Sequence, residues 1–150
     1  MRALILAILF LSGTAQALQV TMKQAMYQAK VDAAFSIACE LTKYTCDGIT
    51  SPRAVYTVEV DSRGVWGMYY AGEAEVLLSF RSLGESTAFQ NGVLVHEIVH
   101  YLQAIEGRNV LDGCGKEEEA WKAFNDFQRK YGSEGEVNLN WSKGYPQCKK

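Results

Sequence analysis

The sequence predicts a single α+β domain, and three observations lead to this fold class. Apolar residues recur at helical spacing before residue 43 and again after residue 89. Residues 54–80 instead form short apolar or alternating runs separated by turn residues, as strands do. The chain has 150 residues, which is enough for one domain with a core and too few for two. Together these features indicate helices packed on a small sheet.

The first 17 residues are predicted to be a secretory signal peptide. A positively charged start is followed by an apolar run over residues 3–11 and by small residues at Ala15 and Ala17. That run is shorter than the about 20 residues that a membrane-spanning helix needs, which argues against the alternative of a retained anchor. We therefore expect cleavage after Ala17, a mature domain of residues 18–150, and a secreted or periplasmic protein without stable membrane association.

Predicted export indicates that the four cysteines form disulfides. In an oxidising compartment we expect Cys39, Cys46, Cys114 and Cys148 to form two disulfides. Of the three possible pairings, Cys39–Cys46 with Cys114–Cys148 is preferred, because the first closes a short turn after a helix and the second would hold the C-terminal tail. A cysteine zinc site is the alternative, but no CxxC spacing supports it.

The charge pattern argues against nucleic acid as a partner. The net charge is −2, acids and bases are mixed along the chain, and no Lys/Arg-rich run marks a basic surface. An apolar content of 48% and a charged content of 21% are typical of a globular protein.

The first predicted helix covers residues 22 to about 43, with Thr21 as its N-cap and an apolar stripe that starts at Met22 and Met26. Three strands are predicted to follow, over residues 54–60, 65–70 and 75–80. Because the turns between them are short, we expect an antiparallel meander in which each strand pairs with the next.

Two helices are predicted after the sheet. Apolar residues from Val93 to Ile105 mark a buried helix that ends at Gly107. The last helix carries an apolar stripe and is followed by Gly132. This stripe consists of Ala120, Trp121, Phe124, Phe127 and Tyr131.

The strongest chemical signal is His96-Glu97-Ile98-Val99-His100. His96 and His100 are the only histidines of the chain, and side chains four apart on a helix share one face, so both imidazoles can bind one Zn²⁺. Glu97 is then placed to take a proton from a metal-activated water. The alternative is a pair of structural histidines, but buried imidazoles beside a carboxylate need polar partners, which a metal supplies.

Zinc needs a third protein ligand, and Glu117 is the preferred candidate. At about 100° per residue, Glu117 lies within about 40° of the apolar stripe of the last helix, whereas Glu118 and Glu119 lie more than about 90° away and are expected to face water. The alternative is that the helix dipole alone favours these acids, and Glu118 is the second candidate ligand. Glu106 lies on the wrong face of its helix and is interpreted as a solvated residue at the helix end.

The HExxH pattern at residues 96–100, followed by Glu117-x-x-Ala120, resembles the gluzincin group of zinc metallopeptidases. The short chain and the order of elements resemble its minimal members, the minigluzincins. The resemblance covers the mature chain in outline and is specific only in the two motif helices. It implies a zincin-like fold, zinc bound by the two histidines and Glu117, and Glu97 as the catalytic base. Trp121 departs from the pattern, because many members have an aspartate there that orients a histidine ligand. The residues that orient the ligand side chains must therefore differ in this chain.

The resemblance also implies a substrate-binding edge strand beside the active helix. Residues 75–80 are the candidate, with a plain core strand as the alternative. Tyr101 and Tyr145 could stabilise an oxyanion through their hydroxyls or could serve only in packing.

These patterns predict zinc-dependent hydrolysis of peptide bonds in a peptide or protein substrate. Two other classes stay open: a zinc-binding structural or interaction protein without turnover, and a disulfide-stapled inhibitor or immunity-type module with incidental histidines. A fourth protein ligand would favour the structural protein, and failure to bind metal would favour the inhibitor.

Overall fold

The computed structural model describes the backbone of residues 2–56, 65–79, 86–107 and 113–132, with the side chains of residues 22–55, 65–79, 86–107 and 115–132. The fold class is α+β, as predicted. Within the described residues the elements are α1 (Arg2–Leu41), β1 (Arg53–Tyr56), β2 (Gly67–Tyr70), β3 (Glu75–Leu78), α3 (Thr87–Ile105) and α4 (Gly113–Tyr131).

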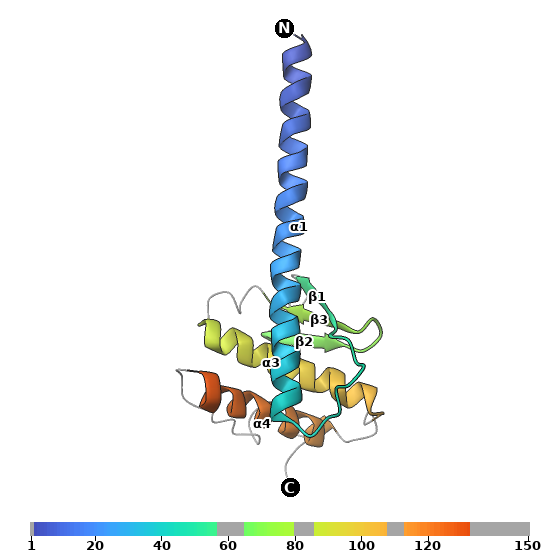
Figure 1. Cartoon of the computed structure of the whole chain (residues 1–150), viewed down its shortest axis with the longest axis vertical. Helices are drawn as coiled ribbons and strands as arrows, with labels where there is room; N and C mark the ends of the chain where they lie inside the picture. Colours follow the sequence, from blue (N-terminus) through green and yellow to red (C-terminus); the bar gives the residue numbers. More distant parts are fainter. Residues whose placement is uncertain (1, 57–64, 80–85, 108–112, 133–150) are drawn as a thin grey trace.

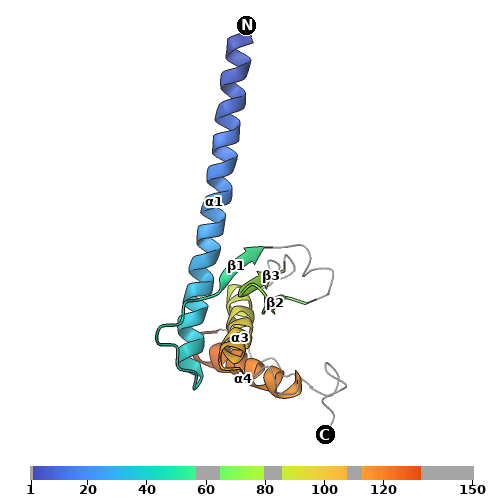
Figure 2. The same cartoon turned by 90° about the vertical axis from the view of Figure 1, so that its right-hand side faces the viewer.

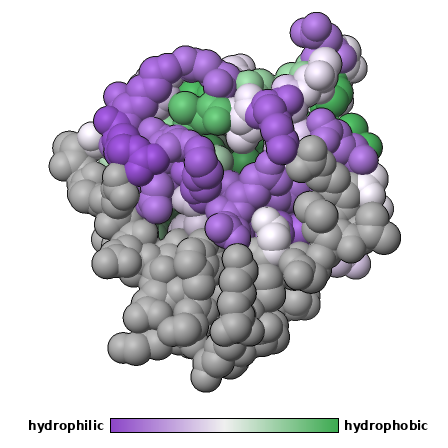
Figure 3. Space-filling view, turned by 90° about the horizontal axis from the view of Figure 1, so that it is seen from below, coloured by the Kyte–Doolittle hydropathy of each residue, from purple (hydrophilic) through white to green (hydrophobic). Residues whose placement is uncertain are grey.

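Helix α3 is the central element of the fold. The sheet lies on one side of it and α4 on the other, while α1 runs along the side of this stack and extends well beyond it (Figures 1 and 2). The core between these elements includes Val31 of α1, Val76 of β3, Ile98 of α3 and Phe127 of α4, all buried. Seen from below, the described residues present mainly hydrophilic side chains (Figure 3). Among the helices in the described part of the chain, none is long and apolar enough to cross a membrane.

The sheet is mixed, so the predicted antiparallel meander is wrong. Strand β3 is central: β2 pairs with it antiparallel, with Tyr69 opposite Val76, and β1 pairs with it parallel, with Ala54 opposite Val76. Within the described residues, the turn over residues 71–74 is the only one that joins consecutive strands as a hairpin. Every residue of β3 is buried, as is typical of a central strand covered on both faces. Residues 75–78 are therefore a core strand and not the predicted substrate-binding edge.

Helix α1 differs from its prediction in both start and buried face. It continues without a break from Arg2 to Leu41, so Thr21 caps no helix. Met22 and Met26 are 58% and 65% exposed, although they were expected to start the buried stripe. The buried face is formed by Val31, Ala34 and Ala38. These residues lie in the C-terminal half of α1, where α3 and the sheet pack against it.

Two glutamines of α1 bind the outer edge of β1. The Gln28 side chain accepts a hydrogen bond from the Ala54 amide at 3.0 Å and donates one to the Pro52 carbonyl at 3.0 Å. Gln24 donates to the Ala54 carbonyl at 2.5 Å. Because a side-chain amide offers the same donor and acceptor as a peptide group, α1 satisfies backbone groups that would otherwise be left unpaired at this edge.

A disulfide joins Cys39 and Cys46, the first of the two preferred pairs, with an S–S distance of 2.03 Å. It closes the segment that follows α1 and that carries the buried Tyr44. The side chains of Cys114 and Cys148 lie outside the described residues, so the second pair stays a prediction.

The two later helices end where predicted. The Ser86 hydroxyl caps α3 by accepting a hydrogen bond from the Phe89 amide at 3.1 Å. Gly107, with a φ of +72°, follows its C-terminus in the left-handed conformation that favours glycine. Helix α4 ends at Tyr131 and buries Phe124 from the predicted stripe against α3.

Candidate metal centre

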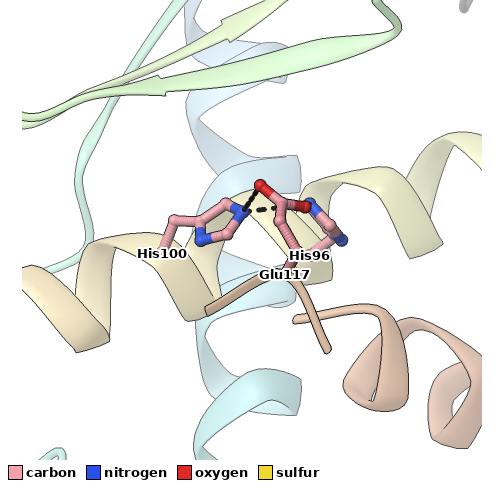
Figure 4. A group of neighbouring side chains, drawn as sticks. All are labelled: His96, His100 and Glu117. Carbon is pink, nitrogen blue, oxygen red and sulfur yellow. Dashed lines mark hydrogen bonds and ion pairs between the residues drawn. The ribbon is translucent and has the colours of Figure 1, made fainter. Parts of the chain in front are cut away.

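The structure brings together His96 and His100 of α3 and Glu117 of α4. The two histidine Nε2 atoms are 3.1 Å apart. One carboxylate oxygen of Glu117 lies 3.4 Å from His96 Nε2, and the other lies 3.3 Å from His100 Nε2. Figure 4 shows all three side chains pointing toward one another. The helical phase of α4 thus puts Glu117 at the histidines.

These spacings fit a zinc ion. Zinc binds imidazole nitrogen and carboxylate oxygen at about 2.0–2.2 Å, so two ligand atoms of a tetrahedral site are separated by about 3.3–3.6 Å. The three measured separations are close to this range, and one ligand atom from each residue can be chosen so that all lie within 4.8 Å of one another. Two imidazoles and a carboxylate are also a ligand set that zinc accepts.

The charges of the site favour a cation between these atoms. Burial alone would lower the pKa of His100, but the hydrogen bond to Glu117 and the negative charges of Glu97 and Glu117 outweigh it and raise the pKa above its ordinary value. Burial would raise the pKa of Glu117, yet hydrogen bonds from His100 and His96 hold it well below its ordinary value. Without metal, the site therefore favours a proton on the histidine.

The other acids considered as ligands lie elsewhere. Glu118 and Glu106 are exposed, in line with their expected solvation. Glu119 was expected to face water, and this is wrong: its Oε2 accepts hydrogen bonds from Tyr44 Oη at 2.5 Å and from Gln103 Nε2 at 3.1 Å. Among the described residues, no further His, Cys, Asp or Glu joins the three-residue group.

Glu97 is held by the sheet. Its side chain is 6% exposed, and its Oε2 accepts a hydrogen bond from the backbone amide of Tyr69 at 2.8 Å. The amide that makes this bond points away from β3, at the edge of β2 beside α3. The carboxylate of Glu97 is thus fixed through one oxygen, close enough to His100 to raise the pKa of that histidine.

Gly67 allows this close approach of strand and helix. A Cβ atom at Gly67 would lie 2.9 Å from Val93 Cγ1 and 3.1 Å from Glu97 Cγ, closer than neighbouring atoms tolerate. The absence of a side chain at Gly67 therefore sets the distance between β2 and Glu97.

The residues that contact the rings of the two histidines from outside the ligand set were not predicted. Gln103 is 1% exposed, and its Oε1 lies 2.9 Å from His100 Nδ1. Its position three residues after a candidate ligand was the available signal, because such pairs are neighbours on a helix. Trp121 instead packs its ring on His96, with centroids 4.2 Å apart. Within the described residues, His96 Nδ1 has no hydrogen-bond partner.

The two tyrosines considered for oxyanion binding have different outcomes. Tyr101 is 7% exposed, and its hydroxyl donates to the Thr50 carbonyl at 2.7 Å. Its ring contacts those of Phe35 and Tyr69, so Tyr101 is a packing residue. Tyr145 lies outside the described residues.

Comparison with known proteins finds no matching family model, no matching curated protein and no matching solved structure. The case for a function therefore depends on the geometry of the residues described above.

Proposed function

We propose that this protein is a small exported zinc metallopeptidase of gluzincin type, with His96, His100 and Glu117 as metal ligands and Glu97 as general base. The observation that carries the proposal is the convergence of the two Nε2 atoms on both oxygens of the Glu117 carboxylate. Surface acids often cluster without binding a metal. Here, however, His96 is buried, and the ligand types and spacings match what zinc requires.

Bound zinc would supply positive charge that lowers the pKa of a water and polarises the substrate carbonyl. Hydrolysis adds the water oxygen to the carbonyl carbon, breaks the C–N bond and moves one proton from the water to the leaving amine. Glu97 is the group that takes and returns this proton, through the carboxylate oxygen that does not bind Tyr69. A carboxylate held through one oxygen keeps the other in a fixed position, which general-base catalysis requires.

We assign the substrate backbone to the edge of β2 that faces away from β3. In a strand, the amide and carbonyl of one residue point to the same side, so the Tyr69 amide that reaches Glu97 marks the backbone groups that face away from β3. An extended peptide beside this edge would lie next to α3 and the proposed metal site. This moves the expected substrate strand from residues 75–80 to β2.

A structural zinc site without turnover is the second candidate. Structural sites are closed by four protein ligands, whereas catalytic sites keep one position for water or substrate. Three candidate ligands within the described residues, together with a buried carboxylate beside them, favour the peptidase.

The test combines metal content with activity. Purified mature protein should contain about one zinc per chain by elemental analysis. It should also cleave a mixed peptide library, and a chelator should abolish the cleavage. Zinc binding without cleavage would favour a structural zinc site over a peptidase. Absence of zinc from wild-type protein after incubation with the metal would refute the proposal.

A further inference from the structure

We infer that Gln103 is a positioning residue that fixes the tautomer and orientation of His100, acting within a partly buried chain of hydrogen bonds that reaches Tyr44. The inference rests on the proposed metal site, since it gives the orientation of His100 a purpose. Three hydrogen bonds form this chain. They link His100 Nδ1 to Gln103 Oε1, Gln103 Nε2 to Glu119 Oε2, and Tyr44 Oη to Glu119 Oε2.

The partners of Gln103 determine which way its amide faces. Its nitrogen lies 3.0 Å from the carbonyl oxygen of Lys116 and 3.1 Å from Glu119 Oε2. A carbonyl oxygen only accepts hydrogen bonds, and so does an ionised carboxylate, so the group facing them must be the NH₂. The amide oxygen of Gln103 therefore faces His100.

This orientation fixes the proton on His100. An amide oxygen can only accept, so Nδ1 of His100 must be the donor across the 2.9 Å contact. In the neutral imidazole the lone pair then lies on Nε2, the atom that faces His96 and Glu117, and Nε2 donates to Glu117 only while the ring carries a second proton. The Gln103 side chain thereby selects the tautomer that can bind a metal there.

The far end of the chain is firmly held. Gln103 is 1% exposed and Tyr44 is 5% exposed, and the Glu119 carboxylate between them is half-buried. Tyr44 lies in the segment closed by the Cys39–Cys46 disulfide. Gln103 also binds the carbonyl of Lys116, the residue before Glu117, and so ties the first turn of α4 to α3. The same side chain orients one candidate ligand and anchors the backbone next to another.

A matched control exists in the same helix interface. Gln128 is 2% exposed and donates from α4 to the Ala88 carbonyl of α3 at 3.0 Å, without contacting a histidine. Gln103→Met removes two glutamine hydrogen bonds between these helices and Gln128→Met removes one, while both substitutions keep similar side-chain volume. A role limited to helix packing predicts similar effects of both substitutions.

Zinc affinity, measured by competition with a chelator, is the first readout. We expect Gln103→Met to weaken zinc binding by about 10- to 100-fold, the usual effect of losing a residue that orients a ligand, and Gln128→Met to change it less than about threefold. The double variant Gln103→Glu/Glu119→Gln exchanges carboxylate and amide. His100 keeps an acceptor and positions 103 and 119 stay linked, while the donor to the Lys116 carbonyl is lost. The double variant should bind zinc more tightly than Gln103→Met. Equal affinities of wild type and Gln103→Met would overturn the inference.

The tautomer of His100 is a second readout that needs no metal and no variant. Imidazole ¹⁵N shifts of metal-free wild type, recorded where the ring is neutral, should show the proton on Nδ1. A proton on Nε2 would overturn the inference even if Gln103→Met failed to fold. If wild type bound no zinc, the proposed function would fail, and the tautomer would still decide the role of Gln103.

Discussion

The backbone amide of Tyr69 donates to Glu97 Oε2 at 2.8 Å, which joins the edge strand of the sheet directly to the residue between the two candidate ligands. Through this bond the sheet controls where the carboxylate lies, although Glu97 belongs to α3. The position of the proposed base therefore depends on how closely β2 approaches the helix.

Glu97→Gln should separate metal binding from catalysis. The amide can still accept from Tyr69 but cannot take a proton, so we expect zinc affinity close to wild type and a loss of peptide cleavage of about 10²- to 10⁴-fold. Glu73→Gln, at an exposed carboxylate, is the control and should behave like wild type in both assays. Cleavage by Glu97→Gln at the wild-type rate would rule out this residue as the base.

Glu117→Ala should lose zinc, whereas Glu118→Ala should keep it. The two residues are adjacent, but only the Glu117 carboxylate lies at the histidines, and Glu118 is exposed. Chelator competition on both variants tests this directly. Loss of the metal in Glu118→Ala but not in Glu117→Ala would contradict the ligand set.

The stability of the metal-free protein should fall as the pH rises above the ordinary histidine value of 6.5. The pKa of His100 is raised in the folded state, so its contribution is fully present below 6.5 and is lost as the pH rises through the raised value. Urea unfolding at a series of pH values, with a chelator present, measures this loss. His100→Gln should lack that part of the pH dependence, and an identical pH profile for both proteins would disprove the coupling.

Gly67→Ala should destabilise the protein and impair cleavage. The new Cβ would press on Val93 and Glu97, and such overpacking costs about 1–3 kcal/mol. Gly72→Ala is the control, since its Cβ would come no closer than 3.4 Å, to the Tyr70 ring. Denaturant unfolding and peptide cleavage should show Gly67→Ala impaired in both and Gly72→Ala near wild type.

The mature chain should begin at Leu18 and contain two disulfides. Intact-mass analysis of protein isolated from its native location, with and without reductant, measures both features. A retained N-terminus would contradict the signal peptide, and four free thiols would contradict the disulfides.

Local sequence periodicity was sufficient to predict the fold class, the end of α3 and the phase of Glu117. Each depends on a repeat or a terminal residue within one element. The strand order was not predictable in this way, because β1 pairs with β3 across the intervening β2. The continuous apolar run Val76-Leu77-Leu78 was nevertheless a sign of a central strand.

The wrong assignments of Glu119 and Met22 have the same physical cause. Glu119 was assigned to solvent from its angle on α4, but Tyr44, 75 residues earlier in the chain, binds it. The apolar stripe at Met22 was assigned to the core, but Met22 is exposed, although Gln24 and Gln28 in the same stretch of α1 bind β1. Helical phase identifies a face of a helix, and only the tertiary structure determines what that face meets.

The glutamines of α1 also limit how this protein can associate with copies of itself. Fibre growth by sheet extension requires two available edges per molecule, one for the preceding copy and one for the next. Gln24 and Gln28 occupy backbone groups at the β1 edge, so in the described sheet further strand pairing is limited to the β2 edge, where Glu97 already binds the Tyr69 amide. Strand addition between copies would therefore stop at a pair. Both glutamines lie after the predicted cleavage point, so the mature chain keeps this barrier to polymerisation.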